Sequence, residues 1–169
     1  MRILVKLFDV KCAFEPFSNG DWLDLHSRYD MSWKAPYADR LSRNKTARTV
    51  NFERMMIPLG VAMKLPEGYE AWILPRSSSY KKFGFIQANS MGVVDNSFRG
   101  SGDEWMLPVI PLEAGEVKAG DRVCQFRIAL SQKATPWQRI KWLFNHRIEF
   151  DFVRDFDGDD RGGFGSTGV

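Results

Sequence analysis

Short apolar or alternating runs, separated by turn residues, dominate the chain and predict an all-β protein. The expected strands lie within residues 2–10, 48–66, 68–75, 83–95, 104–112 and 121–130. The second run reads as two strands broken at Pro58-Leu59-Gly60, and Gly-Asp pairs at 102–103 and 120–121 supply turns. Strands at this spacing are typical of a β-sandwich or barrel.

Helical periodicity is weak, and one segment stays open between helix and strand. A helix over residues 136–147 would place four large apolar side chains on one face: Trp137, Ile140, Leu143 and Phe144. The same segment also reads as a strand that leads into residues 148–153. Residues 35–49 are polar and basic, and we expect a loop there. No repeat or long linker divides the chain, so one domain is predicted.

Bulk composition fits a single soluble domain. The 169 residues can bury a sizeable core, and a net charge of +3 without a Lys/Arg block predicts no nucleic-acid partner. No apolar run approaches the roughly 20 residues that span a bilayer, so no membrane partner is predicted. Cys12 and Cys124 form no CxxC pair, and two histidines give no zinc-ligand spacing. Free thiols in a cytoplasmic protein are the expectation.

The segment PRSSSYKKFG, residues 75–84, is a candidate anion-binding site. Its arginine, serines and lysines can satisfy phosphate oxygens with charged and hydroxyl donors. A polar turn explains the same composition, and both readings stay open at this point. The phosphate-binding pattern GxxxxGK[ST] is absent from the chain.

The segment NSMGVVDNSFRG, residues 89–100, places a carboxylate where a strand meets a turn. A carboxylate held there can act as a general base on a water molecule, and Asp95 is the candidate. A turn-capping Asp is the alternative. Gly92 permits close approach of a ligand or backbone, or marks a bulge.

The C-terminal residues 155–169 combine five glycines with four acidic residues, yet they do not form a calcium loop. Counting from Asp155, the sixth position of an EF-hand would need Gly and holds Asp160, and the twelfth would need Glu and holds Ser166.

Taken in order, five segments resemble the five motifs of the trimeric dUTP pyrophosphatases (dUTPases). They are GDWLDLHS (20–27), PRSSSYKKFG (75–84), NSMGVVDNSFRG (89–100), AGDRVCQF (119–126) and RGGFGSTG (161–168). Order and approximate spacing agree over residues 20–168. The first and last motifs are most similar to those of bacteriophage and Gram-positive enzymes.

The resemblance implies a jelly-roll-like subunit in a homotrimer whose active sites lie at the subunit interfaces. Residues 1–154 would form the β-rich domain. Residues 155–169 would form a flexible tail that closes over a neighbouring subunit's site. The implied reaction is hydrolysis of dUTP to dUMP and pyrophosphate, with Mg²⁺ on the triphosphate.

The resemblance also assigns roles to individual residues. Asp95 would be the general base for water attack on the α-phosphate, and Asp24 would support the metal through water, with Asp30 as its rival. Phosphate contacts would come from Arg76, Ser77, Ser78 and Gln125. The uracil hairpin would comprise Asn89, Gly92, Val93 and Val94, while Phe98, where the family usually has Tyr, would pack on the deoxyribose. The tail would contribute Arg161, Phe164, Gly165 and Ser166.

Two other functions remain as alternatives to a dUTPase. A dCTP deaminase of the same superfamily is the first, although those enzymes lack this combination of Gly-Val-Val-Asp and Gly-Gly-Phe-Gly-Ser-Thr-Gly. The second is a phage regulatory protein of the same fold that binds a host regulatory protein, with or without enzymatic activity.

Overall fold

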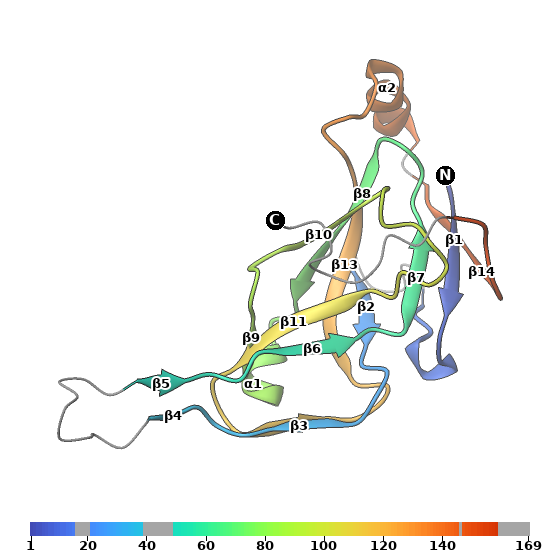
Figure 1. Ribbon diagram of the computed structural model, residues 1–169. Helices are drawn as coiled ribbons and strands as arrows, with labels where there is room; N and C mark the ends of the chain where they lie inside the picture. Colours follow the sequence, from blue (N-terminus) through green and yellow to red (C-terminus); the bar gives the residue numbers. More distant parts are fainter. Residues whose placement is uncertain (16–20, 39–48, 146, 159–169) are drawn as a thin grey trace.

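The computed structural model describes residues 1–15, 21–38, 49–145 and 147–158, and β-strands predominate in them (Figure 1). The strands are β1 (Arg2–Leu7), β2 (Leu23–His26), β3 (Met31–Trp33), β4 (Tyr37–Ala38), β5 (Val50–Asn51), β6 (Met55–Pro58), β7 (Val61–Lys64), β8 (Tyr69–Pro75), β9 (Phe85–Gln87), β10 (Gly92–Asp95), β11 (Met106–Pro111), β12 (Gly115–Val117), β13 (Arg122–Leu130) and β14 (Glu149–Val153). The helical elements in these residues are α1 (Ser79–Phe83), α2 (Pro136–Phe144) and a 3-10 turn, η1 (Val10–Cys12). The predicted all-β class is confirmed.

A four-stranded antiparallel sheet, in the order β10-β8-β13-β2, forms the centre of the molecule. Side chains alternate across it because successive residues of a strand point to opposite faces. Ala71, Ile73 and Phe126 are buried on the inner face. Trp72 and Gln125 are half-buried on the outer face. The sheet therefore closes the core on one side and presents polar and apolar side chains on the other.

The remaining sheets complete the core. Strand β1 pairs in parallel with β14 and antiparallel with β7, and β11 lies between β6 and β9. Trp105 is fully buried, and its ring packs edge-on against Phe126 with 5.5 Å between centroids. Phe14 makes a similar edge contact with Phe126 at 5.4 Å, so aromatic rings join the central sheet to the segment that follows β1.

Helix α2 settles the choice between helix and strand for its segment, and helix α1 lies where the sequence suggested a polar turn. Residues 136–144 are helical because Thr135 accepts a hydrogen bond from the Gln138 N–H at 3.2 Å, while the Gln138 side chain accepts one from the Thr135 N–H. Helix α1 was not expected, since the sequence read as a polar turn. Within the expected 35–49 loop, residues 37–38 form strand β4, which pairs with β5, and residues 39–48 lie outside the described part.

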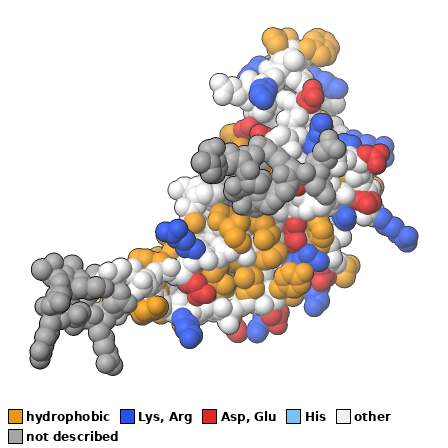
Figure 2. All heavy atoms as spheres, in the orientation of Figure 1, with side chains coloured by type: hydrophobic (Ala, Val, Ile, Leu, Met, Phe, Trp, Pro, Cys, Tyr) orange, Lys and Arg blue, Asp and Glu red, His pale blue; other side chains and the backbone are white. Residues whose placement is uncertain are grey.

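Helix α2 presents its apolar face to solvent rather than to the core. Four large apolar side chains of the helix are between 49% and 82% exposed: Trp137, Ile140, Leu143 and Phe144. Figure 2 shows apolar side chains at the tip of the molecule, where Figure 1 places α2. The opposite face holds the helix in place, because the rings of Trp142 and Tyr69 lie 5.5 Å apart. Over the described residues, neither this helix nor α1 has the length and apolar character needed to cross a membrane.

Both cysteines are free, as expected, and both are buried. Cys12 lies against the turn between β6 and β7, where Gly60 has a positive φ of 66°. A Cβ on Gly60 would lie 2.3 Å from the Cys12 Sγ. The Gly60 N–H donates to Glu104 Oε1 at 2.9 Å, and Arg28 donates to Glu104 Oε2 at 2.8 Å. This turn therefore has both a glycine-only conformation and no space for a side chain.

Replacing Gly60 with Ala should lower the free energy of unfolding by about 3 kcal/mol, from an unfavourable φ and from crowding against Cys12. Gly120→Ala is the matched control, because Gly120 also has a positive φ of 89° but its nearest contacts would be at 3.8 Å. It should cost only about 1–2 kcal/mol. Urea unfolding of both variants measures the difference, and equal losses would contradict the crowding argument.

Candidate functional site

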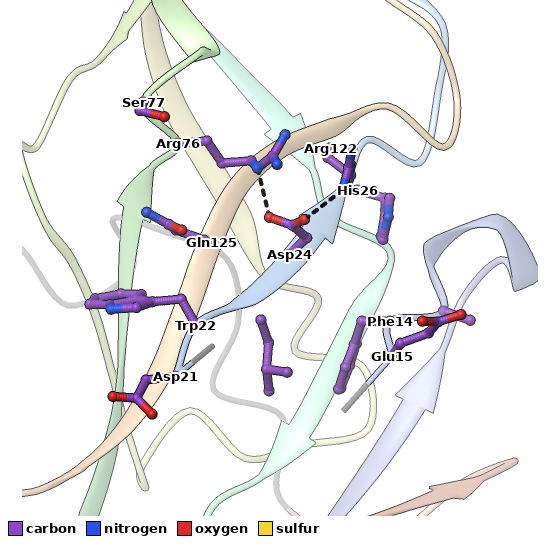
Figure 3. A pocket seen from close by; sticks show the side chains of 12 residues that line it. Phe14, Glu15, Asp21, Trp22, Asp24, His26, Arg76, Ser77, Arg122 and Gln125 are labelled. Atoms are coloured by element: carbon purple, nitrogen blue, oxygen red, sulfur yellow. Dashed lines mark hydrogen bonds and ion pairs between the residues drawn. The ribbon is translucent and has the colours of Figure 1, made fainter. Parts of the chain in front are cut away.

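An open cavity of about 720 Å³ lies beside the end of β8, where β2 and β13 run past it (Figure 3). Three chain segments that are distant in sequence supply most of its polar lining: Asp24, His26, Arg76, Ser77, Arg122 and Gln125. The carboxylates of Glu15 and Asp21 also line it. The pairing of β2 with β13 explains this grouping, because Gln125 lies opposite Asp24 and Arg122 lies opposite His26. Segments 20–27, 75–84 and 119–126 thus meet at one place.

Asp24 is the electrostatic centre of this cavity. Its Oδ1 lies 2.7 Å from Arg76 Nε, and its Oδ2 lies 3.2 Å from Arg122 Nη1. The side chains of Asp24 and Arg76 are 26% and 25% exposed, so their pair is partly shielded from water. Two guanidinium groups on one carboxylate leave a net positive charge, and guanidinium donors suit the oxygens of a phosphate.

Burial lowers the pKa of His26 below its ordinary value of 6.5. Asp24 opposes this effect by raising the pKa, while Arg122 and Arg76 lower it further. The imidazole therefore stays neutral at neutral pH, so Arg76 and Arg122 are the cationic side chains among the residues that line the cavity.

Ser79 positions the arginine that follows β8. It is 1% exposed, and its hydroxyl donates to the Val123 carbonyl at 2.9 Å. The same oxygen accepts a hydrogen bond from the Arg76 N–H at 3.0 Å. Gln125 Nε2 donates to the Pro75 carbonyl at 3.2 Å. These bonds tie the start of the 75–84 segment to β13, so the expected grouping of Arg76, Ser77 and Gln125 is present, whereas Ser78 lies outside the cavity wall.

The predicted uracil hairpin lies between β9 and β10, apart from the arginine cavity. A small cavity of about 40 Å³ is lined by residues that include Asn89, Gly92, Val93 and Val94. A Cβ on Gly92 would lie 3.2 Å from Ile73 Cβ and 3.7 Å from Asn89 Nδ2. Gly92 therefore allows this hairpin to lie closely against β8, as its place in the motif suggested.

Asp95 ends β10 and is exposed. Its Oδ1 accepts hydrogen bonds from the Ser97 N–H at 2.9 Å and from the Ser97 hydroxyl. These contacts match the turn-capping interpretation of Asp95. They also hold its carboxylate in a fixed position. Phe98 follows in the same turn and is half-buried against the core.

The strand register separates the two groups of predicted site residues within one chain. Asp95 lies opposite Glu70 near the start of β8, while Arg76 follows its end. Six residues at about 3.3 Å each put Asp95 roughly 20 Å from Arg76 along the strand. One chain therefore does not bring the candidate base to the arginine cavity.

The remaining predicted site residues are the two candidates for supporting the metal and the tail residues. Asp24 lies in the arginine cavity, whereas its rival Asp30 accepts a hydrogen bond from the Ala119 N–H at 2.8 Å and does not line it. No group of three or more His, Cys, Asp or Glu side chains in the described residues could hold a metal ion. The predicted tail residues lie outside the described part: Arg161, Phe164, Gly165 and Ser166.

Sequence reasoning missed several residues of the cavity wall. Arg122 forms an ion pair with Asp24, and His26 lines the same cavity. Trp22 lines another part of the cavity, with the Arg127 guanidinium 5.7 Å from its ring. Arg122 stands within the fourth motif and His26 within the first, so pairing these two motifs as adjacent strands would have identified both residues.

Comparison with known proteins gives one consistent result. The dUTPase family model matches residues 34–168. The SPbeta prophage-derived deoxyuridine 5'-triphosphate nucleotidohydrolase YosS of Bacillus subtilis (strain 168) is 40% identical over 170 aligned residues, which cover 100% of this chain and 99% of that protein. The deoxyuridine 5'-triphosphate nucleotidohydrolase of Finegoldia magna is 38% identical over 120 residues, 69% of this chain and 72% of that protein.

Solved structures confirm the predicted fold. The dUTPase from Streptococcus mutans has a TM-score of 0.59 at 18% identity and covers 75% of this chain and 94% of its own. A variant of the Staphylococcus bacteriophage 80alpha dUTPase with dUpNHpp has a TM-score of 0.57 at 17% identity, with coverage of 99% and 98%.

Asp24→Asn should lower the pKa of His26 further, because the variant removes the carboxylate that opposes burial and the two arginines. An NMR titration of the His26 ring protons measures the shift, with His26→Gln to assign the signal. Asp21→Asn is the control, since Asp21 lines the same cavity but is not among the charges that shift His26. A rise of the pKa in Asp24→Asn would contradict the assignment.

Proposed function

The chain belongs to the dUTPase family and is a dUTP diphosphatase, and we propose that each of its active sites combines residues from different subunits of a homotrimer. The strand register, which puts Asp95 and Arg76 roughly 20 Å apart along β8, is the observation that carries this proposal. A nucleotide spans that distance only in part, so the base-binding hairpin of one chain must face the arginine cavity of another. A closed ring of three heterologous contacts provides three identical sites.

The outer face of the central sheet supports contact with another subunit. Trp72 and Leu74 are half-buried there, and Val93, which lies opposite Trp72, is 51% exposed. Asp95 and Glu70 lie opposite one another on the same face. An apolar surface that also carries Asp95 suits an interface at which a site is completed.

The arginine cavity is the proposed phosphate site. Arg76 and Arg122 are held by Asp24, and the Gln125 amide and Ser77 hydroxyl provide neutral donors beside them. Charge neutralisation by fixed donors is the main requirement of phosphoryl chemistry. Ser78 does not line the cavity, so its hydroxyl would contact the phosphates only if the substrate extends beyond Ser77.

Asp95 is the proposed general base. Its carboxylate accepts a proton from a water molecule, the water oxygen forms a bond to the α-phosphorus, and the bond from that phosphorus to the bridging oxygen breaks. The products are dUMP and pyrophosphate. Ser97 fixes one carboxylate oxygen through its N–H and hydroxyl, so the base keeps its position without substrate.

The donor set of the cavity is compatible with Mg²⁺, because this ion is usually held by one or two carboxylates, waters and substrate phosphates. Asp24 would hold it indirectly through water. When bound, the ion supplies charge neutralisation on the triphosphate. The tail residues Arg161, Phe164, Gly165 and Ser166 are proposed to cover the substrate of a neighbouring subunit. The deaminase reaction and the host-regulator role remain alternatives from the sequence.

Asp95→Asn should reduce kcat for dUTP by roughly 10²–10⁴-fold, because the amide cannot accept the proton. Affinity for a non-hydrolysable dUTP analogue should stay within about threefold of the wild type, since the side chain keeps its size. Steady-state kinetics and calorimetry measure the two effects. Asp151→Asn, which alters an ion pair with the exposed Arg2, is the control. A near wild-type rate in Asp95→Asn would eliminate the proposed base.

Mixing two inactive variants tests the shared site. Asp95→Asn and Arg76→Ala chains, unfolded and refolded together in equal amounts, should regain roughly a quarter of the wild-type activity, because a site with both residues intact forms with that probability. Each variant refolded alone is the control. No recovery in mixed trimers, with both chains present by mass spectrometry, would show that each site lies within one chain.

A further inference from the structure

Gln87 is a buried polar residue to which no function has been given above. It is 7% exposed at the end of β9, and its side chain lines the small cavity of the uracil hairpin. Its Nε2 donates to the Ile73 carbonyl of β8 at 3.1 Å and to Asn89 Oδ1 at 2.9 Å. One amide group thus links the hairpin to the central sheet and to the exposed Asn89.

These two bonds fix the orientation of both amides. A backbone carbonyl only accepts hydrogen bonds, so the Gln87 atom that faces Ile73 is the nitrogen. The second hydrogen of that nitrogen needs an acceptor, which makes the facing atom of Asn89 its oxygen. The Asn89 Nδ2 is then directed away from Gln87, and a Cβ on Gly92 would lie 3.7 Å from it. Asn89 therefore presents a donor beside the glycine of the hairpin.

The other atom of the Gln87 amide is a buried acceptor. Gln87 Oε1 has no hydrogen-bond partner among the described residues, although its side chain is almost fully enclosed. A buried acceptor without a partner is unfavourable, and a ligand with a matching donor removes that cost. The hairpin thus offers an acceptor from Gln87 next to a donor from Asn89.

We propose that Gln87 makes this enzyme selective for uracil over cytosine, by holding the Asn89 amide in one orientation and by accepting the N3–H of the base. This inference rests on the proposed function, in which the hairpin binds the base. Uracil has an N3–H donor between two carbonyl acceptors, which matches an adjacent acceptor and donor. Cytosine has an acceptor at N3, so Gln87 Oε1 would face a lone pair. Leaving buried polar groups unpaired is an effective way to reject an analogue.

Thymine is an internal control for this mechanism. Its N3–H and carbonyl groups are those of uracil, so Gln87 cannot distinguish the two bases. Discrimination against thymine must instead come from space around the methyl group at C5. A change at Gln87 should therefore alter selectivity against dCTP and leave selectivity against dTTP unchanged.

Gln87→Met tests the proposal, because Met has a similar shape without the donors or the acceptor. The ratio of kcat/KM for dUTP to that for dCTP should fall roughly tenfold or more. The loss should lie in KM for dUTP, with kcat changed by less than about threefold, because Gln87 does not contact the reacting phosphorus. Ile86→Ala is the matched control: Ile86 precedes Gln87 on the same strand, is 44% exposed and should leave the ratio unchanged.

A second variant separates recognition from folding. Asn89 is exposed, so Asn89→Asp should fold normally while replacing the donor by an acceptor. Its selectivity for dUTP over dCTP should also fall, and calorimetry with dUMP and dCMP should show the same change in binding. In an Asn89→Ala background, Gln87→Met should lower the dUTP to dCTP ratio by a smaller factor than it does alone. The reason is that part of the effect of Gln87 depends on Asn89.

The outcomes distinguish this inference from the proposed function. A wild-type enzyme that hydrolyses dUTP, with the dUTP to dCTP ratio unchanged in Gln87→Met or Asn89→Asp, would overturn the role of Gln87 and leave the function intact. Fully additive losses in the double variant would overturn the link through Asn89. A wild-type protein without dUTP turnover would overturn the function itself.

Discussion

Strand β8 is the constraint on which the arrangement of the site depends. It pairs with β10 on one side and β13 on the other, so its length and register set the positions of both neighbours. The hairpin that would hold the base attaches near its start, and the arginine that would hold the phosphates follows its end. A backbone paired on both edges cannot shorten this separation. In the proposed function, assembly of the subunits would therefore be part of the chemistry, because movement of side chains alone would not complete a site within one chain.

At the phosphate end, charge balance matters as much as position. Asp24 keeps two guanidinium groups close together that would repel one another without it. Because Asp24 and Arg76 are partly shielded from water, these two groups affect each other more strongly than they would on an open surface. Binding of an anion would compete with Asp24 for the same donors. In the proposed phosphate site, the carboxylate would therefore orient Arg76 and Arg122 before the substrate arrives and would also limit how tightly a phosphate binds.

The sequence predicted the strands well where apolar residues alternate and turns are marked by glycine, as in residues 68–75 and 121–130. It grouped Arg76 with Gln125 only through the resemblance, since spacing alone does not reveal which strands pair. Helix α1 was missed because Ser-Ser-Ser favours a turn, whereas a buried Ser79 bonded to Val123 allows a helical turn to begin there. Gln87 was missed for a related reason: its contact with Ile73 exists only after β9 has folded against β8.

The two enclosed cysteines have a practical value for measuring how the enzyme moves. Burial, with Asp9 and Glu104 nearby, raises the pKa of Cys12 to about 11, and burial also raises the pKa of Cys124. Thiol reagents attack the thiolate, so both native sulfurs should resist labelling at neutral pH. A cysteine introduced at a chosen surface position would then carry a fluorophore or spin label selectively, without first removing the native residues. A cysteine introduced in the C-terminal segment could therefore be labelled selectively, and its label would report on that segment by fluorescence or spin-resonance spectroscopy.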